Sequence, residues 1–175
     1  MNQSDIRKPA VAGQFYPSAP KDLNQMISSF ADKAAQKKDV FGCILPHAGY
    51  IYSGRVAVQT ISRVKIRDTL VLLGPNHTGN GEVFSLMPKG YWQTPLGNVE
   101  INSELANLFL SKSKHLKADI LAHLDEHSLE VELPILQYFR KDFKIIPIAI
   151  KTGDLGMLKE TAEELASVIS ANKLK

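Results

Sequence analysis

The chain has 175 residues, of which 44% are hydrophobic and 22% are charged. This length and composition predict a single domain, residues 1–175, with a hydrophobic core, and they argue against a largely disordered protein. The net charge is only +3. The lysines are scattered rather than gathered into a basic stripe with interleaved aromatic residues, so we expect no binding of nucleic acid.

The sequence contains no sign of a membrane or secreted protein. Residues 1–5 are polar and are not followed by the apolar region of a signal peptide, and no apolar stretch is long enough to span a bilayer. The one cysteine, Cys43, excludes an internal disulfide and fits a reducing compartment. We therefore expect a cytoplasmic protein without membrane association, in which Cys43 is a buried, inert thiol.

The first half of the chain predicts two helices and two strands after an irregular start. Apolar residues at helical spacing predict a helix over 21–38, and a second helix is predicted over 54–64. The apolar runs 41–45 and 69–73 each end at or near a proline and predict short buried strands.

The second half continues the alternation. Residues 83–101, with Gly and Pro between short apolar pieces, predict an antiparallel excursion or a long loop. Helices are predicted over 103–110, 128–138 and 155–171, and Pro134 must kink the second of these or lie near its start. Residues 144–150 predict a strand in which Pro147 argues for a bulge or an edge position.

Strands that alternate with helices predict an α/β fold with a mainly parallel sheet flanked by helices. The last predicted element is a helix, where this pattern would normally supply another strand. The sequence therefore leads us to expect a sheet that is incomplete at its C-terminal end.

Two polar tetrapeptides follow predicted strands. Pro46–Gly49 contains His47 and follows the first strand, whereas Gly74–His77 contains Asn76 and His77 and follows the second. Ligands of open parallel sheets collect beyond the carboxyl ends of the strands, so neighbouring strands would bring these two imidazoles together. A single loop histidine is more often a surface residue, but two at equivalent strand ends favour a shared site, and neutral imidazole is a common metal ligand.

A third candidate lies in residues 124–130. Helix capping explains the acidic residues and Ser128, because carboxylates and hydroxyls favour a helix N-terminus. It does not explain His127, which as a neutral imidazole could donate or accept a proton. Two other histidines are predicted to have no role in a site: His123 has apolar neighbours that indicate packing, and His115 lies in a lysine-rich stretch that indicates solvation.

Two tyrosines flank Ile51 directly after the first tetrapeptide. In an extended loop, alternation would place Tyr50 and Tyr52 on one side, where they would line a pocket or cover the end of the sheet. A phosphate loop at residues 52–55 is a rival interpretation, but no full Walker or dinucleotide fingerprint is present. No Gly-x-Ser-x-Gly elbow and no cysteine pair for zinc occur either.

Four motifs in this order resemble the Memo family, named for the mediator of cell motility. They are Arg7–Pro17 (RKPAVAGQFYP), Pro46–Gly54 (PHAGYIYSG), Gly74–His77 (GPNH) and Asp125–Val131 (DEHSLEV). The match covers nearly the whole chain, and four ordered motifs make it specific. Prokaryotic relatives are uncharacterised proteins named alongside a radical-SAM partner, as protein B of the AmmeMemoRadiSam system.

The resemblance implies a fold similar to class III extradiol dioxygenases, which use non-haem iron. His47 and His77 then match metal-binding histidines, and His127 matches a third histidine of the pocket, where Tyr50, Tyr52, Asn76 and Glu126 would also lie. The cofactor implied is Fe(II), ahead of copper or zinc. Family members also carry a later Ser-Asp-x-x-His-type motif and a cysteine or carboxylate that completes the site. This chain ends before either, so it resembles the N-terminal portion of the family domain.

Three functions follow as alternatives. The first is a metal-dependent, dioxygenase-like oxidoreductase in which His47 and His77 hold Fe(II) and His127 acts as acid or base. The second is a binding or scaffold protein without chemistry, whose pocket takes a peptide or a small anion through contacts from Tyr50, Tyr52 and Arg55. The third, a metal-dependent hydrolase, rests on the two histidines alone and lacks a recognisable carboxylate partner.

Overall fold

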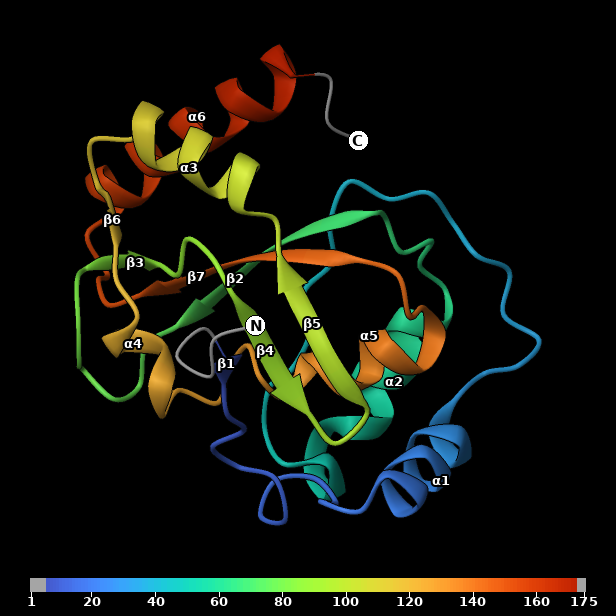
Figure 1. Cartoon of the computed structure of the whole chain (residues 1–175). Helices are drawn as coiled ribbons and strands as arrows, with labels where there is room; N and C mark the ends of the chain where they lie inside the picture. Colours follow the sequence, from blue (N-terminus) through green and yellow to red (C-terminus); the bar gives the residue numbers. More distant parts are fainter. Residues whose placement is uncertain (1–5, 173–175) are drawn as a thin grey trace.

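A computed structural model describes residues 6–172 and shows an α/β fold with a mixed, curled seven-stranded sheet flanked by helices (Figure 1). The architecture is consistent with the dioxygenase-like fold that the family resemblance implies. The strands are β1 (Ile6–Arg7), β2 (Thr69–Pro75), β3 (Phe84–Leu86), β4 (Tyr91–Thr94), β5 (Gly97–Ile101), β6 (Leu116–Ala118) and β7 (Lys144–Ile150).

Strand β7 lies at the centre of the sheet. One of its edges pairs in parallel with the whole of β2, and its other edge is shared between β5, which is parallel, and β3, which is antiparallel. The pairs β1–β4 and β3–β6 are parallel, and β4–β5 is an antiparallel hairpin. The sheet is therefore mainly parallel, as predicted, and residues 83–101 form the predicted antiparallel excursion.

The helices form two groups on either side of the β2–β7 strands (Figure 1). Helices α1 (Pro20–Phe30), α2 (Arg55–Ser62) and α5 (Glu132–Phe139) pack against one another, with the π-helical turn η2 (Tyr50–Gly54) leading into α2. Helices α3 (Ser103–Lys112) and α6 (Leu155–Ala171) pack together on the other side, and α4 (Leu121–Leu124) is a single turn. The predictions for α2, α3 and α6 are confirmed.

Pro147 occupies a central strand, so the prediction of a bulge or an edge is wrong. It pairs in regular register with Leu72 of β2. The carbonyl of Ile145 accepts a hydrogen bond from the Asn102 amide, on the side of β7 that faces away from β2. Every second residue of a strand directs its main-chain groups to the same side, so Pro147 faces away from β2 as well. On that side the pairing of β7 with β5 ends at Ile145 of β7, and its pairing with β3 begins at Ile148. Pro147 faces the fork between them, where neither strand pairs with it, so its missing N–H interrupts no pairing of β5 or β3 with β7 and the strand stays regular.

Residues 41–45 form no strand, so this prediction is also wrong. Phe41 is 96% exposed and Ile44 is 97% exposed, and Cys43 is exposed rather than buried. Among residues 6–172 no strand pairs with this run. An apolar run becomes a buried strand only when neighbours supply hydrogen bonds and cover its faces, and here neither is present.

Two helices are shorter than predicted. Helix α1 ends at Phe30 rather than Lys38, because its apolar stripe ends there and the polar residues that follow have no face to bury. Helix α5 begins at Glu132, and Pro134 lies in its first turn, which is the second of the two predicted positions.

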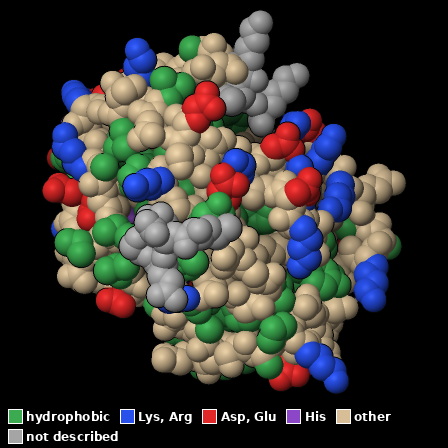
Figure 2. All heavy atoms as spheres, viewed as in Figure 1, with side chains coloured by type: hydrophobic (Ala, Val, Ile, Leu, Met, Phe, Trp, Pro, Cys, Tyr) green, Lys and Arg blue, Asp and Glu red, His purple; other side chains and the backbone are tan. Residues whose placement is uncertain are grey.

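No helix within residues 6–172 is both long and apolar enough to cross a membrane. On the face shown in Figure 2, lysine and arginine side chains are interspersed with aspartate and glutamate. That distribution is typical of a solvated protein surface.

Candidate metal centre

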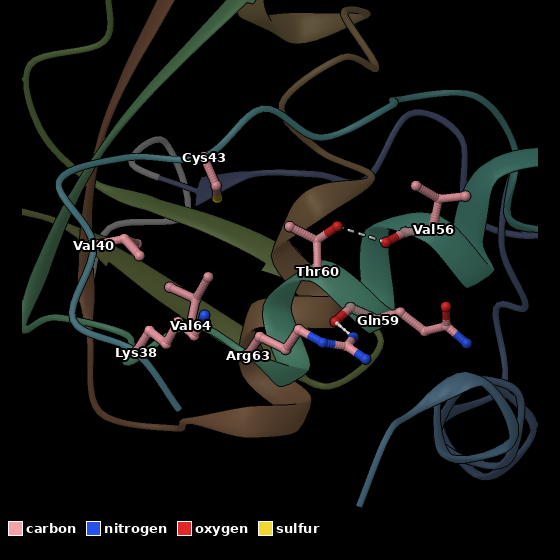
Figure 3. A pocket seen from close by; sticks show the side chains of 8 residues that line it. All are labelled: Lys38, Val40, Cys43, Val56, Gln59, Thr60, Arg63 and Val64. Atoms are coloured by element: carbon pink, nitrogen blue, oxygen red, sulfur yellow. Dashed lines mark hydrogen bonds between the residues drawn. The ribbon is translucent and has the colours of Figure 1, made fainter. Parts of the chain in front are cut away.

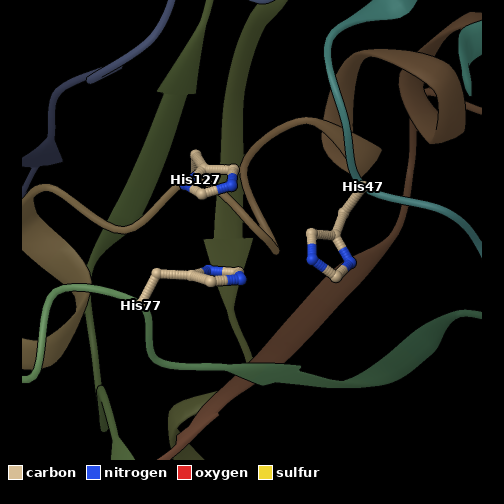
Figure 4. A group of neighbouring side chains, drawn as sticks. All are labelled: His47, His77 and His127. Carbon is tan, nitrogen blue, oxygen red and sulfur yellow. The ribbon is translucent and has the colours of Figure 1, made fainter. Parts of the chain in front are cut away.

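Three imidazoles converge at one edge of the fold (Figure 4). His47 follows the 41–45 run, His77 lies two residues after β2, and His127 lies in the loop between α4 and α5. One ring nitrogen of each histidine lies within 4.8 Å of those of the other two. The ring centroids of His77 and His127 are stacked at 4.6 Å, and that of His47 lies 5.3 Å from His77 and 6.0 Å from His127.

The turn after β2 holds His77 in place. The Asn76 amide continues the β-ladder by donating to the carbonyl of Ile150 at 2.8 Å. The Asn76 side chain then closes the turn: its Oδ1 accepts from the Thr78 hydroxyl at 2.8 Å and from the Gly79 amide at 3.0 Å. Asn76 therefore shapes the backbone that presents His77. Its predicted contact with a ligand in the pocket stays a prediction.

Glu126 joins two of the three histidines. Its carboxylate is fully buried and accepts hydrogen bonds from the backbone amides of His77, His127 and Ser128, the last two at 2.9 Å. It also lies 2.9 Å from Nδ1 of His77. When Nδ1 carries the proton and donates it to Glu126, the lone pair of Nε2 is left for a metal, which is the arrangement that carboxylates commonly impose on ligand histidines.

The electrostatics keep the Glu126 carboxylate ionised and favour the neutral forms of His47 and His127. Burial alone would raise the pKa of Glu126, but the hydrogen bonds from His77 and Ser128 outweigh it and bring the pKa to about 2. Burial, and then the neighbouring His77, lower the pKa of His47. The pKa of His127 is lowered by burial first, against the opposing effect of Glu126, and further by His77 and His47. Neutral imidazole is the form that binds metals.

The N-terminal segment braces the same loop, a role that the sequence alone did not reveal. Arg7 is buried, forms an ion pair with Glu130, and donates from Nη2 to the carbonyl of Glu126 at 2.7 Å. The hydroxyl of Tyr16 donates a hydrogen bond to the Glu130 carboxylate at 2.6 Å, and the ring centroids of Phe15 and His127 lie 4.8 Å apart. The presence of Arg7–Pro17 among the family motifs was the signal that could have indicated these contacts.

The two predicted pocket tyrosines lie on different sides. Residues 50–54 are helical rather than extended, so the alternation that placed both rings together is wrong. Tyr50 is 2% exposed and donates its hydroxyl to the Val131 carbonyl in the core, whereas Tyr52 is 82% exposed. Tyr52 lines an open cavity of about 580 Å³ together with His47 and His127. The guanidinium of Arg55 lies over the ring of Phe30 instead.

The remaining histidines lie away from the centre. His123 is fully buried, its ring edge-on to Trp92, which confirms the packing role. His115 is mostly covered and its Nε2 lies 2.8 Å from Glu160, so the expectation of a solvated side chain is wrong.

The donor set fits a transition metal. Imidazole suits Zn, Cu, Fe and Ni, and three imidazoles leave coordination positions open for other ligands. Nitrogens bound to one metal at roughly 2.1 Å lie within about 4.2 Å of each other. The observed limit of 4.8 Å is close to this span, so small side-chain rotations would complete the three contacts.

Comparison with known proteins points to one family. The family model described as "Memo-like protein" matches residues 7–174. The chain is 45% identical over 168 residues to a MEMO1 family protein of Methanosarcina acetivorans, a match that covers 95% of this chain and 60% of that protein. It is 43% identical to a MEMO1 family protein of Aquifex aeolicus, over 94% of this chain and 62% of that one. The chain thus spans less than two thirds of these relatives' length.

Proposed function

Because this chain belongs to the Memo family, we propose that it is a metal-binding member in which His47 and His77 hold one divalent transition metal and His127 serves the same centre as a further ligand or as an acid or base. The observation that carries the proposal is the convergence of three imidazole nitrogens from three separate segments. The buried Glu126 carboxylate supports it, because it orients the His77 ring and leaves Nε2 directed away from the carboxylate.

We propose Fe(II) as the metal, because the fold is consistent with that of the dioxygenases which use it. Iron with open coordination positions would supply binding and activation of oxygen next to a small aromatic or phenolic substrate. In this chain Tyr52 and Phe15 line the cavity beside His127 and would contact that substrate. His127 either completes the ligand set or moves a proton between the substrate and the solvent.

A metal-binding experiment tests the ligand assignment. Wild-type protein and the variants His47→Ala, His77→Ala and His127→Ala are titrated anaerobically with Fe(II) and, separately, with Zn²⁺ and Cu²⁺. His115→Ala is the matched control, because it removes a histidine outside the centre. We expect one metal per chain in wild type and control, and a large loss of affinity in His47→Ala and His77→Ala. Equal binding by all the proteins would refute the assignment.

The role of His127 is separated by combining metal content with oxygen consumption in the presence of catechol-like compounds. A His127→Ala protein that loses the metal identifies His127 as a ligand. One that keeps the metal and loses turnover identifies an acid or base. Glu126→Gln should weaken metal binding about 10- to 100-fold, the range found when a carboxylate behind a ligand histidine is removed. Glu163→Gln, on an exposed face of α6, is its control.

The second candidate is a binding protein without chemistry. The open cavity beside His47 has apolar walls contributed by Phe15, Leu45 and Pro46, and such walls would also suit an apolar side chain of a peptide. Metal-loaded protein that consumes no oxygen with any catechol-like compound, but binds peptides at this cavity, would favour this function over the oxidoreductase.

A further inference from the structure

Strand β2 has the apolar composition of an interior strand, but it lies at an edge of the sheet. Within residues 6–172 it pairs with β7 alone, so no strand pairs with its other edge, although the Pro75 carbonyl at the end of that edge accepts a hydrogen bond from the Ser128 hydroxyl at 2.8 Å. Its apolar residues Leu70–Leu72 are only half-buried and Leu73 is 54% exposed, whereas residues 145–149 of β7 are all buried. Strands that are apolar on both faces normally lie inside a parallel sheet. A free apolar edge is also a template for pairing with another chain segment.

The exposed run Phe41–Leu45 starts beside the segment that leads into β2. Lys38 forms a parallel bridge with Val64: the Lys38 amide donates to the Arg63 carbonyl at 2.7 Å, and the Lys65 amide donates to the Lys38 carbonyl at 2.9 Å. Beyond this bridge the two segments no longer pair. β2 joins the sheet, whereas the 41–45 run continues with Phe41 and Ile44 in solvent and only Leu45 half-buried against the core.

The 38–43 segment is not packed on the helix behind it. An open cavity of about 500 Å³ separates it from α2 (Figure 3). Val40 and Cys43 line one side of the cavity, and Val56 and Val64 line the other. Apolar side chains thus face an open space from both sides, which is an unfavourable arrangement unless another part of a protein fills it.

We propose that the free edge of β2 and the Phe41–Leu45 run form a docking surface for an extended polypeptide segment, supplied by the part of Memo family chains that has no counterpart in this one. The segment would pair with the N–H and C=O groups of residues 69, 71 and 73, which point away from β7, and its apolar side chains would cover Leu73, Phe41 and Ile44. Relatives that match 94–95% of this chain are much longer than it, since the match covers only 60–62% of their length. The proposal is independent of any metal.

Hydrogen exchange tests the docking surface. The chain alone is compared with a fusion of the chain to the unmatched region of the Methanosarcina acetivorans relative, both in EDTA so that metal binding plays no part. In the fusion we expect the amides of 41–45 and those of residues 69, 71 and 73 in β2, which point away from β7, to exchange at least about tenfold more slowly, while those of α6 do not change. Alkylation of Cys43, the one thiol of the chain and exposed on this surface, should slow in parallel.

Variants of the fusion locate the contact. Phe41→Lys combined with Ile44→Lys should restore fast exchange at the amides of residues 69, 71 and 73, whereas Leu155→Lys, at a residue 81% exposed elsewhere, should not. Unchanged exchange in a folded fusion overturns the proposal. Protection in the chain alone that increases with protein concentration also overturns it, because it would identify a second copy of the chain as the occupant. If the fusion does not fold, hydrogen exchange is measured on the intact Methanosarcina acetivorans relative instead. The segments of that protein that align with 41–45 and with β2 must then be protected, and fast exchange there overturns the proposal.

Discussion

Glu132, in the first turn of α5, carries a buried carboxyl group without a partner. No group within residues 6–172 donates a hydrogen bond to either of its oxygens. Burial raises the pKa of this carboxyl from its usual 4.5 to about 8. We therefore predict that Glu132→Gln stabilises the fold above pH 5, since the amide keeps the shape of the side chain but cannot ionise.

The size and sign of the effect follow from the two protonation states. Below pH 4.5 the carboxyl is protonated in both the folded and the unfolded chain, so its ionisation has no effect on stability. Between pH 4.5 and 8 the unfolded chain alone loses the proton, and the free energy of unfolding falls as the pH rises. At pH 7, with folded and unfolded pKa values of about 8 and 4.5, the loss is about 3 kcal/mol.

The assay is urea unfolding of wild type and Glu132→Gln at several pH values from 4 to 8.5. We expect similar stabilities at pH 4 and a variant that is about 3 kcal/mol more stable at pH 7. Burial lowers the pKa of His123 to about 4, which makes both proteins lose stability as the pH falls from 6.5 toward 4, and this effect cancels in the difference. A difference that stays constant over the whole pH range would refute the reasoning.

Two further predictions concern the segments that hold the histidine loops. Arg7→Ala leaves Glu130 buried without its partner and should cost about 3–5 kcal/mol, whereas Arg63→Ala breaks an exposed pair and should cost less than about 1 kcal/mol in the same urea assay. Gly81→Ala adds a Cβ against the Asp119 carboxylate at φ +71°, and Gly79→Ala adds one in open space at φ +73°. Both substitutions strain the backbone, so the difference between them measures the clash. We expect the melting temperature of Gly81→Ala to be lower than that of Gly79→Ala, and equal melting temperatures would contradict the clash.

The strongest sequence predictions were those that depend on local pattern. The apolar run of β2, the helical periodicity of α6 and the Gly/Pro punctuation of residues 83–101 each identify their element, because propensity, pattern and turn chemistry agree there. The tetrapeptides that contain His47 and His77 also indicate a common edge of the sheet, and the structure brings these two imidazoles together with His127. Whether they bind a metal stays a prediction.

The wrong predictions share one cause, which is that strand pairing, backbone conformation and burial depend on the surrounding structure as well as on the local pattern. The run at 41–45 has strand composition but no neighbour in the described part of the chain, so it stays in solvent. Pro147 has an edge-strand signature but lies where the sheet forks, so its missing N–H is harmless. Tyr50 and Tyr52 alternate in sequence, yet a helical turn sends one ring into the core and the other into solvent.

The sequence by itself determined the fold class, the family and the three histidines, because each of these is encoded in contiguous residues: an apolar run, a periodic stripe or a short motif. The tertiary structure alone decided how the histidines are held, because the supporting contacts join separate parts of the chain: Glu126 and His77 are 49 positions apart, and Arg7 and Glu130 are 123 apart. It also decided which apolar surfaces remain open, since exposure depends on what the rest of the chain brings beside a segment.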